Sequence, residues 1–414
     1  MAANTYNVVD WVLYDMLDSL LNKLAVASYF NTDANKAYDQ PFPVGSTVHV
    51  ELPWQPLIRD GTAYTAQGIK RLTTDVVIDQ PFGIDFEWDS FERALRMRKS
   101  EAALKREFND KAMEQLAQEI ESRAALFAYQ NTPNIVGVLG TDPTTFDATS
   151  AAARQQLVEL GCPEGEKCCI VPPSVMRALK NGAIGFFNPV TDITKQFRTG
   201  IVGSGDGFEW YESVSLFRHT SGIWAGAVTL SSAVANGANT LAVTCTTGDT
   251  FLPGDVISIG AVNPVNPRTR RVVGPNNRRF VNLTSQTGVA NAATLTVYPT
   301  IYGPGDPYQN VETLPANAAA LTMFPGTAAP TVAHAGINGL AFHRDAFALV
   351  GVELEQPNGS VEICKQVRDP ETGIAIRFLR QFDGRLSTMI NRFDCYMGFG
   401  RLRPENCAVR ILGA

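Results

Sequence analysis

A stretch without glycine or proline, from Trp88 to Thr132, constrains this fold more than any other feature. Its apolar residues at steps of four and then three are Leu104, Phe108, Ala112, Leu116, Ile120, Ala124 and Phe127. This spacing predicts one amphipathic helix over residues 88–130, about 60 Å long at ~1.5 Å rise per residue. Because one small core cannot wrap a helix of that length, we expect it to act as a spine.

Capping and charge patterns favour the same helix. Asp89 is expected to cap its N-terminus, and Glu92 three residues later completes a capping-box pattern. Glutamate precedes a basic residue by four positions at Glu101–Lys105, Glu107–Lys111 and Glu119–Arg123, and each such pair stabilises a helix by ~0.3 kcal/mol. A coiled-coil strand is the alternative, but the stripe does not keep the required spacing of 3.5 residues.

An extended hairpin is predicted before the spine helix. Residues 4–27 approximate helical spacing, and residues 31–45 read as a polar arm. Alternating runs at 47–52 and 74–78 then predict two strands joined by a polar tip at residues 55–71. Such an arm has little core of its own, so we expect it to lie on a neighbouring chain.

Composition changes sharply after Gly222. From Ala225 to about Thr331 the chain is rich in Thr, Val, Asn, Gly and Pro and nearly devoid of Lys and Glu. Alternating runs at 240–244, 256–259, 280–283 and 294–298 predict a small antiparallel barrel or sandwich. We interpret it as an inserted domain, because helix-forming sequence resumes at Arg344–Leu349.

Mixed elements are expected on either side of the insertion. The predicted elements before it are a helix at 151–160, a strand at 168–171 and a helix at 174–181. Those after it are strands at 361–363, 374–378 and 408–412, with one or two helical turns at Arg385–Asn391. With 414 residues, the chain is expected to form two or three domains.

Charge and cysteine content exclude several classes of protein. A net charge of −6 argues against a dedicated nucleic-acid binder, which needs a basic face. The N-terminus lacks the pattern of a signal peptide, and no stretch reaches the ~18 apolar residues of a membrane span. The seven scattered cysteines contain no Cys-x-x-Cys and are expected to be reduced in a cytosolic product.

Patterns of catalytic or metal-binding residues are absent from the sequence. None of its four histidines lies near a Gly-x-Ser-x-Gly. The nearest candidate is His219-Thr220-Ser221-Gly222, and two residues of one loop seldom make a triad. The glycine-rich run Gly203–Gly207 is followed by Phe208, where a dinucleotide loop would need glycine. We therefore predict no catalytic residue, no metal, no cofactor and no enzymatic activity. A carbohydrate-binding or carbohydrate-processing β-domain stays open as an alternative, because glycosidase carboxylates have no fixed spacing.

The one conspicuous concentration of charge is the basic cluster Arg268, Arg270, Arg271, Arg278 and Arg279. It falls in a Pro/Asn/Gly-rich loop of the insertion. A solvated loop and a nucleic-acid contact are alternatives, but we favour an intersubunit site in which these arginines pair with carboxylates of a neighbour. The same hypothesis includes Arg59, Lys70 and Arg71 of the hairpin arm.

The order of these elements resembles that of tailed-phage major capsid proteins of the Hong Kong 97 type, and the insertion narrows the resemblance to P22-like coat proteins. Residue-level likeness is clearest at 254–262, 280–281 and 295–299 and in the exit segment 340–347. The resemblance implies an α+β fold with an N-arm, an extended E-loop hairpin, a spine helix, a P-domain, an A-domain and an inserted small antiparallel β-barrel.

The resemblance also implies domain boundaries. They are 1–45 for the N-terminal helix and arm, 46–80 for the E-loop, 81–145 for the P-domain with the spine helix, 146–222 for the first part of the A-domain, 223–332 for the inserted β-barrel, 333–358 for the A-domain return and 359–414 for the C-terminal strands of the P-domain.

The function that the resemblance implies is that of a structural coat subunit of a short-tailed phage. Copies would form hexamers and pentamers and close into an icosahedral shell around double-stranded DNA, without sequence-specific binding and without a membrane. A scaffolding protein and a portal protein are the further partners implied, with assembly in the host bacterial cytoplasm. An encapsulin-like compartment shell is the alternative, against which the inserted domain argues.

If the hairpin arm lies on a neighbour, its tip should be ordered only in the assembly. We expect amide hydrogens of residues 55–71 to exchange quickly in the isolated subunit and slowly in the shell. Hydrogen–deuterium exchange of both forms measures this, and strong protection of the tip in the isolated subunit would contradict it.

Overall fold

The computed structural model describes residues 8–33, 47–58, 61–62, 68–69, 71–89, 110–143, 145, 147–182, 204–324, 330–357, 363–370 and 372–413. The chain divides into two compact units. Unit 1 comprises Met1–Val50, Thr74–Ala124 and Phe347–Arg401, and unit 2 comprises Glu51–Thr73, Ala125–Ala346 and Leu402–Ala414.

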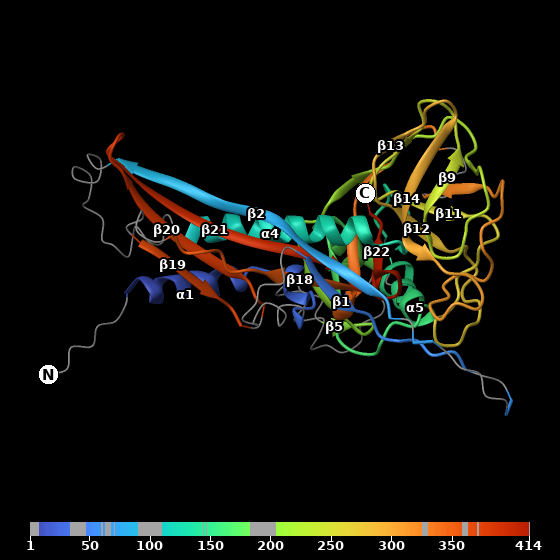
Figure 1. Ribbon diagram of the computed structural model, residues 1–414, viewed down its shortest axis with the longest axis horizontal. Helices are drawn as coiled ribbons and strands as arrows, with labels where there is room; N and C mark the ends of the chain where they lie inside the picture. The colour runs from blue at the N-terminus through green and yellow to red at the C-terminus, as the bar shows by residue number, and fades with distance from the viewer. Residues whose placement is uncertain are drawn as a thin grey trace. The chain divides into compact units, whose positions relative to one another are not determined.

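A six-stranded sheet organises unit 1, with the order β1-β2-β21-β20-β19 and β18 also paired to β21. Its strands are β1 (Thr47–Glu51), β2 (Thr73–Asp89), β18 (Phe347–Gly351), β19 (Ile363–Arg368), β20 (Ala375–Asp383) and β21 (Thr388–Arg401). The antiparallel pairing of β2 with β21 runs from Val77 opposite Phe399 to Asp89 opposite Thr388. Figure 1 shows β2, β21 and β20 as long neighbouring strands.

The two faces of this sheet differ because side chains alternate along each strand. On one face, the ring of Phe393 in β21 lies 6.0 Å from that of Phe86 in β2 and 5.0 Å from that of Phe378 in β20. On the other face, Asp394 accepts hydrogen bonds from Arg377 and Arg392. The apolar face therefore needs a cover, and the charged face does not.

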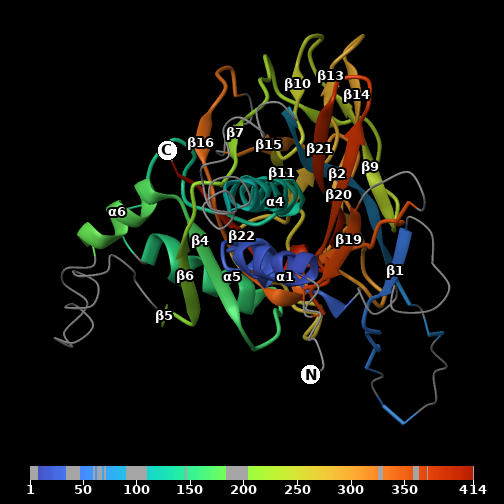
Figure 2. The ribbon, with the colours of Figure 1, turned by 90° about the vertical axis from the view of Figure 1, so that its left-hand side faces the viewer.

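Two helices lie on the same side of the sheet (Figure 2). Helix α1 (Val8–Leu21) packs on β19 and β20. Helix α4 (Asp110–Asn131) contacts β2 through Arg123, whose guanidinium stacks on Phe82 at 4.8 Å and donates to the Gln80 Oε1 at 2.8 Å.

The start predicted for the spine helix is wrong. Trp88 and Asp89 are the last residues of β2, so Asp89 pairs with Thr388 and does not cap a helix. The alternation Phe82, Ile84, Phe86, Trp88 continues a strand, and it outweighs the absence of glycine and proline on which the helix prediction relied. Residues 90–109 lie outside the described parts, and with them Leu104, Phe108, Glu92 and the predicted pairs Glu101–Lys105 and Glu107–Lys111.

The part of the predicted helix that the structure describes has the expected faces. Ala112, Leu116, Ile120 and Ala124 are buried, and Phe127 is half-buried. The predicted Glu119–Arg123 pair forms with 2.6 Å between oxygen and Nε. Lys111 pairs with Glu114 at 3.0 Å.

A buried carboxylate fixes the N-terminal segment to α4. After α1, the chain forms a short 3-10 helix (Ala27–Tyr29). The side chain of Val26, the residue before it, forms no capping hydrogen bond. Glu121 of α4, only 4% exposed, accepts hydrogen bonds from the amides of Val26 at 2.7 Å and Ala27 at 2.9 Å. Burial raises the pKa of Glu121, and these backbone bonds oppose that shift.

Unit 2 contains two six-stranded sheets, one in the order β3-β22-β17-β4-β6-β5 and the other in the order β15-β11-β12-β14-β9-β8. The first consists of β3 (Ile135–Val136), β4 (Lys167–Val171), β5 (Ser204–Gly205), β6 (Phe208–Glu212), β17 (Gly339–His343) and β22 (Ala408–Ile411). The helices of this unit are α5 (Ala152–Glu159), preceded by a π-helical turn (Asp147–Ala151), α6 (Pro173–Gly182) and α8 (Pro404–Cys407). The helices predicted at 151–160 and 174–181 and the strand predicted at 168–171 are thus confirmed.

The second sheet is the inserted domain. Its strands are β8 (Thr229–Leu230), β9 (Ala238–Thr244), β11 (Val256–Ile259), β12 (Arg279–Asn282), β14 (Ala292–Ile301) and β15 (Leu321–Met323), which confirms all four predicted runs. Two smaller pairs join β10 (Thr250–Phe251) to β13 (Gln286–Thr287) and β7 (Arg218–Thr220) to β16 (Ala335–Ile337).

The inserted sheet closes on itself. Leu230 of β8 donates its amide to the Ala319 carbonyl at 3.0 Å, and Leu321 of β15 donates to the Val228 carbonyl at 2.9 Å. These bonds join the first strand of the sheet to the last and leave a barrel-like domain. Its core is continuous and apolar, with Trp224 and Phe280 completely buried.

Two helical predictions near the C-terminus are wrong. Arg344–Leu349 forms a 3-10 turn (Arg344–Ala346) followed by β18, whose residues are all buried, so a strand buried on both faces shows no alternation to recognise. Arg385–Asn391 leads into β21 after a turn in which Asp383 accepts the Arg385 amide at 2.8 Å. The predicted strands at 361–363, 374–378 and 408–412 correspond to β19, β20 and β22; residues 361 and 362 lie outside the description.

The buried Glu121 generates a pH prediction. Because its folded-state pKa is raised above the ordinary 4.5, its contribution to stability is fully present below that value and is lost as pH rises through the folded pKa. The variant Glu121→Gln cannot ionise, so we expect the gap in unfolding free energy between it and the natural chain to change from about pH 4 upward. Chemical denaturation across that range measures the gap, with Glu119→Gln, a change at an exposed position of the same helix, as the control. A gap that does not vary with pH would contradict the prediction.

Candidate intersubunit site

The basic loop connects β11 to β12 and is shaped by Asn266. The Asn266 side-chain oxygen accepts the amides of Arg268 at 2.8 Å and Thr269 at 3.2 Å, and the Asn266 amide donates to the Arg271 carbonyl at 3.0 Å. Asparagine favours such turns because its side chain mimics the backbone. The loop tip therefore carries Arg268, Thr269 and Arg271 outward in a defined turn.

Arg270 turns back into the inserted domain. Its guanidinium donates to the carbonyls of Asp306 at 2.7 Å and Pro307 at 2.5 Å. Burial lowers the pKa of Arg270, and Asp306 opposes that shift. Arg270 thus ties the basic loop to a second loop of the same domain.

Arg278 and Arg279 are also used within the chain. Arg278 is 2% exposed and donates to the Glu405 carbonyl at 3.4 Å. Arg279 donates to the Ile135 carbonyl, and its guanidinium stacks on the Phe324 ring at 4.4 Å. Burial lowers the pKa of Arg279 to about 10.

Two arginines of the cluster remain directed to solvent. Arg268 and Arg271 are exposed, and neither forms an ion pair with another residue in the described ranges. In the hairpin arm, Arg71 pairs with Glu51 at 2.7 Å. Arg59 and Lys70 lie outside the residues that the structure describes. The sequence shows how many arginines the loop carries. Only the fold shows which of them bond within the chain and which are exposed to solvent.

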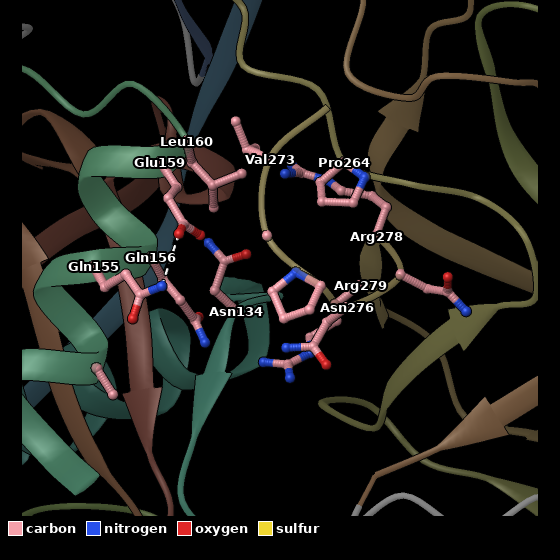
Figure 3. Close-up of a pocket in the computed structure, with 14 residues that line it drawn as sticks. Asn134, Gln155, Gln156, Glu159, Leu160, Pro264, Val273, Asn276, Arg278 and Arg279 are labelled. Carbon is pink, nitrogen blue, oxygen red and sulfur yellow. Dashed lines mark hydrogen bonds between the residues drawn. The ribbon is translucent and has the colours of Figure 1, made fainter. Parts of the chain in front are cut away.

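A cavity of about 260 Å³ lies between α5 and the basic loop (Figure 3). Five asparagine and glutamine residues line it, and two of them form hydrogen bonds beside it: Gln155 donates to Glu159 at 2.8 Å and Gln156 donates to the Ile135 carbonyl at 3.0 Å. Asn266 of the basic loop donates to the Glu159 carbonyl at 2.7 Å. The Asn266 bond attaches the loop to α5, so we interpret the cavity as part of the structure that supports the loop.

The residues considered for catalysis have structural partners. His219 is buried with its Nε2 2.9 Å from Asp255 Oδ1, and the hydroxyl of Ser221 accepts the His334 amide at 3.0 Å. His343 accepts the Asp345 amide at 3.1 Å and so caps the turn that follows β17. Sequence reasoning missed Asp255, whose only signal was its place in the turn Pro253-Gly254-Asp255.

Other chemistry is sparse in the residues that the structure describes. Among them, no cluster of three or more His, Cys, Asp or Glu side chains is placed to bind a metal. All seven cysteines are free, and six of them are buried. Within the same ranges, no helix combines the length and apolar character needed to cross a membrane.

The sequence of this chain matches the model of one known protein family. A model of the P22 coat protein (gene protein 5) family matches residues 1–413. Comparison with curated protein sequences gives no match. The matched family consists of capsid-forming coat proteins, so this chain is a major capsid protein of a bacteriophage. It belongs to the P22 coat protein family.

Solved structures from phages are similar to this chain at low identity. A Mycobacterium phage Che8 structure has 14% identity and a TM-score of 0.47, covering 94% of this chain and 92% of that one. The capsid of Ralstonia phage GP4 has 8% identity and a TM-score of 0.42, with coverages of 94% and 88%. The capsid of Helicobacter pylori bacteriophage KHP30 has 10% identity and a TM-score of 0.41, with coverages of 93% and 90%.

The sheets and helices confirm the expected α+β fold class, and the sheet of the insertion is barrel-like. Membership of the P22 coat protein family agrees with the expected capsid fold of the Hong Kong 97 type. It also confirms the function expected from the resemblance, that of a structural subunit that assembles with copies of itself into the shell of the virion.

The division of the basic cluster predicts a difference in stability. Arg270→Ala should lower the unfolding free energy of the subunit by about 1–2 kcal/mol, because two carbonyls lose a charged donor. Arg268→Ala, an exposed change in the same loop, should stay within about 0.5 kcal/mol of the natural chain. Denaturant titration of both variants measures this, and equal losses would refute the division.

Proposed function

We propose that this chain is the coat subunit of a short-tailed double-stranded DNA phage. It forms hexamers and pentamers that close into an icosahedral shell in the host bacterial cytoplasm, with a scaffolding protein directing assembly and a portal protein replacing one pentamer. The family match across residues 1–413 carries the proposal. The subunit has no catalytic role in it.

The net charge of −6 supports a shell that encloses DNA without binding it tightly. Tight binding to a polyanion relies on many arginine and lysine contacts to phosphate. Three of the five arginines in the basic cluster are engaged within the chain, which leaves few for such contacts. The genome is thus confined by the closed shell and not by specific contacts.

The proposed domain layout keeps the boundaries implied by the resemblance. Closure of the barrel between Val228 and Leu321 agrees with an inserted domain at 223–332. The same layout assigns the described part of β2 up to residue 80 to the E-loop and α4 to the P-domain.

Within this proposal, Arg268 and Arg271 form the intersubunit contact of the inserted domain. They are exposed at the tip of a turn that Asn266 holds in shape. Arginine pairs with carboxylates in a planar, bidentate manner, and a preformed turn reduces the entropy lost on pairing. Arg59, Lys70 and Arg71 of the hairpin arm are the second basic group proposed to reach a neighbour.

Electron microscopy of the purified protein tests the main proposal. We expect closed shells or ring-shaped capsomers, alone or after a scaffolding protein is added. A protein that stays a compact monomer at every concentration, with and without scaffolding protein, would overturn the proposal.

A salt series tests the arginine contact. Combining Arg268→Ala with Arg271→Ala should raise the protein concentration needed for assembly at low salt. The difference from the natural chain should shrink as salt is added, because ions screen exposed pairs over about 8 Å at 0.15 M ionic strength. Light scattering follows assembly, and Thr269→Ala at the same tip is the uncharged control. Identical assembly of all three proteins at every salt concentration would remove these arginines from the interface.

A further inference from the structure

Residues 404–411, which contain α8 and β22, contact the inserted barrel at two places. The first contact is made by Glu405. The hydroxyl of Tyr298, in β14 of the barrel, donates to the Glu405 carboxylate. Arg278, which precedes β12, donates to the Glu405 carbonyl at 3.4 Å. Burial raises the pKa of Glu405, whereas Tyr298 and Arg278 oppose that shift. A carboxyl group outside the barrel thus finds its partners on two barrel segments.

The second place is centred on Arg410 in β22. Its side chain is 1% exposed and donates to the Gly254 carbonyl at 2.7 Å. The guanidinium also stacks on the ring of Tyr129, at the end of α4, at 3.9 Å. Gly254 has φ +93, and a Cβ there would stand 2.9 Å from the Tyr129 ring, so only glycine allows this close approach.

The Arg410 contact falls at the root of the barrel. Asp255, next to Gly254, accepts the amides of Leu252 at 2.7 Å and Gly222 at 3.2 Å and pairs with His219. Gly222 is where the composition of the insertion begins. Arg410 therefore contacts the turn that holds the entry of the chain into the barrel.

The other side of the segment is bound to the rest of unit 2. Asn134 donates to the carbonyls of Glu405 at 3.0 Å and Ala408 at 2.9 Å. Strand β22 itself lies between β3 and β17 in the first sheet. The segment is thus anchored in a sheet and directs two ionisable side chains to the barrel.

We propose that residues 404–411 form a clasp that fixes the inserted barrel in one orientation on the rest of unit 2. The clasp deepens the proposed function, because it takes the barrel to be a separate inserted domain that is presented to neighbouring subunits.

The physical basis of the clasp is the cost of burying charge without a partner. A buried ion whose partner is removed destabilises a protein strongly, whereas a paired one is close to neutral. Glu405 meets Tyr298 and Arg278, and Arg410 meets the Gly254 carbonyl, only when the barrel is seated as described. Any other orientation would remove these barrel partners from two buried ionisable groups.

The barrel does not need the clasp to form its own strands. Its sheet closes through Val228, Leu230, Ala319 and Leu321, and its core lies between Trp224 and Met323. Loosening the clasp should therefore weaken the seating of the barrel, to which Asn266 and Arg279 also contribute, while its strands stay paired. This separation distinguishes a clasp from a contact that merely adds to global stability.

Hydrogen–deuterium exchange of the full-length, unassembled subunit tests the proposal. In a chain carrying Arg410→Met and Glu405→Gln, we expect exchange to speed up by at least about tenfold at residues 222–225, 252–256 and 404–411. Amides of β9 and β14, inside the barrel, should exchange as in the natural chain. Arg268→Met, an exposed arginine of the same barrel, is the matched control and should change none of these segments.

Two results would overturn the clasp. One is that the double variant exchanges like Arg268→Met at all three segments. The other is that β9 and β14 lose as much protection as the clasp, which would make these residues part of the barrel's own folding. If the double variant gives no soluble subunit, Tyr298→Phe replaces it, with faster exchange expected at 404–407 alone and no change there counting against the clasp. Shell formation plays no part in the measurement, so a failure of the proposed function would be seen separately.

Discussion

The antiparallel pairing of β2 with β21 is the constraint on which unit 1 depends. It runs from Val77 to Asp89 and places phenylalanines of both strands on one face. That face must be covered, which explains why α1 and α4 both lie on it. The same alternation places Asp394 on the opposite face, where it is buried and hydrogen-bonded to Arg377 and Arg392. One long register thus determines which side of the sheet receives the helices.

Buried carboxylates join segments that are far apart in the sequence. Glu121 holds the amides of Val26 and Ala27, and Asp255 holds those of Gly222 and Leu252. In both cases backbone amides provide the hydrogen bonds that a buried carboxylate needs. Such contacts add little net stability, but they reject other registers, because a displaced segment would leave the carboxylate unpaired.

The sequence predicted helices and strands correctly where the spacing of its apolar residues matched only one of the two. The barrel strands were predicted closely because turns and alternation mark them, and α5 was predicted closely because its apolar residues have helical spacing. The spine helix was predicted to start at Asp89 because Asp89 and Glu92 match a capping box and no glycine or proline follows, although the alternation from Phe82 to Trp88 already continued a strand. Strand β18 was taken for a helix because burial on both faces removes the alternation. The pairing of Glu405 with Tyr298 could not be predicted, since it joins residues more than a hundred positions apart.

The basic loop shows why a count of charges does not define a site. Five arginines within twelve positions suggested one electrostatic function, yet the fold divides them by their surroundings. Arg270 and Arg279 satisfy backbone carbonyls, and Arg278 is buried against the 404–411 segment. These internal bonds stiffen the loop that carries Arg268 and Arg271. A stiff loop loses less entropy when it binds, so the buried arginines would strengthen the intersubunit contact proposed for Arg268 and Arg271 without taking part in it.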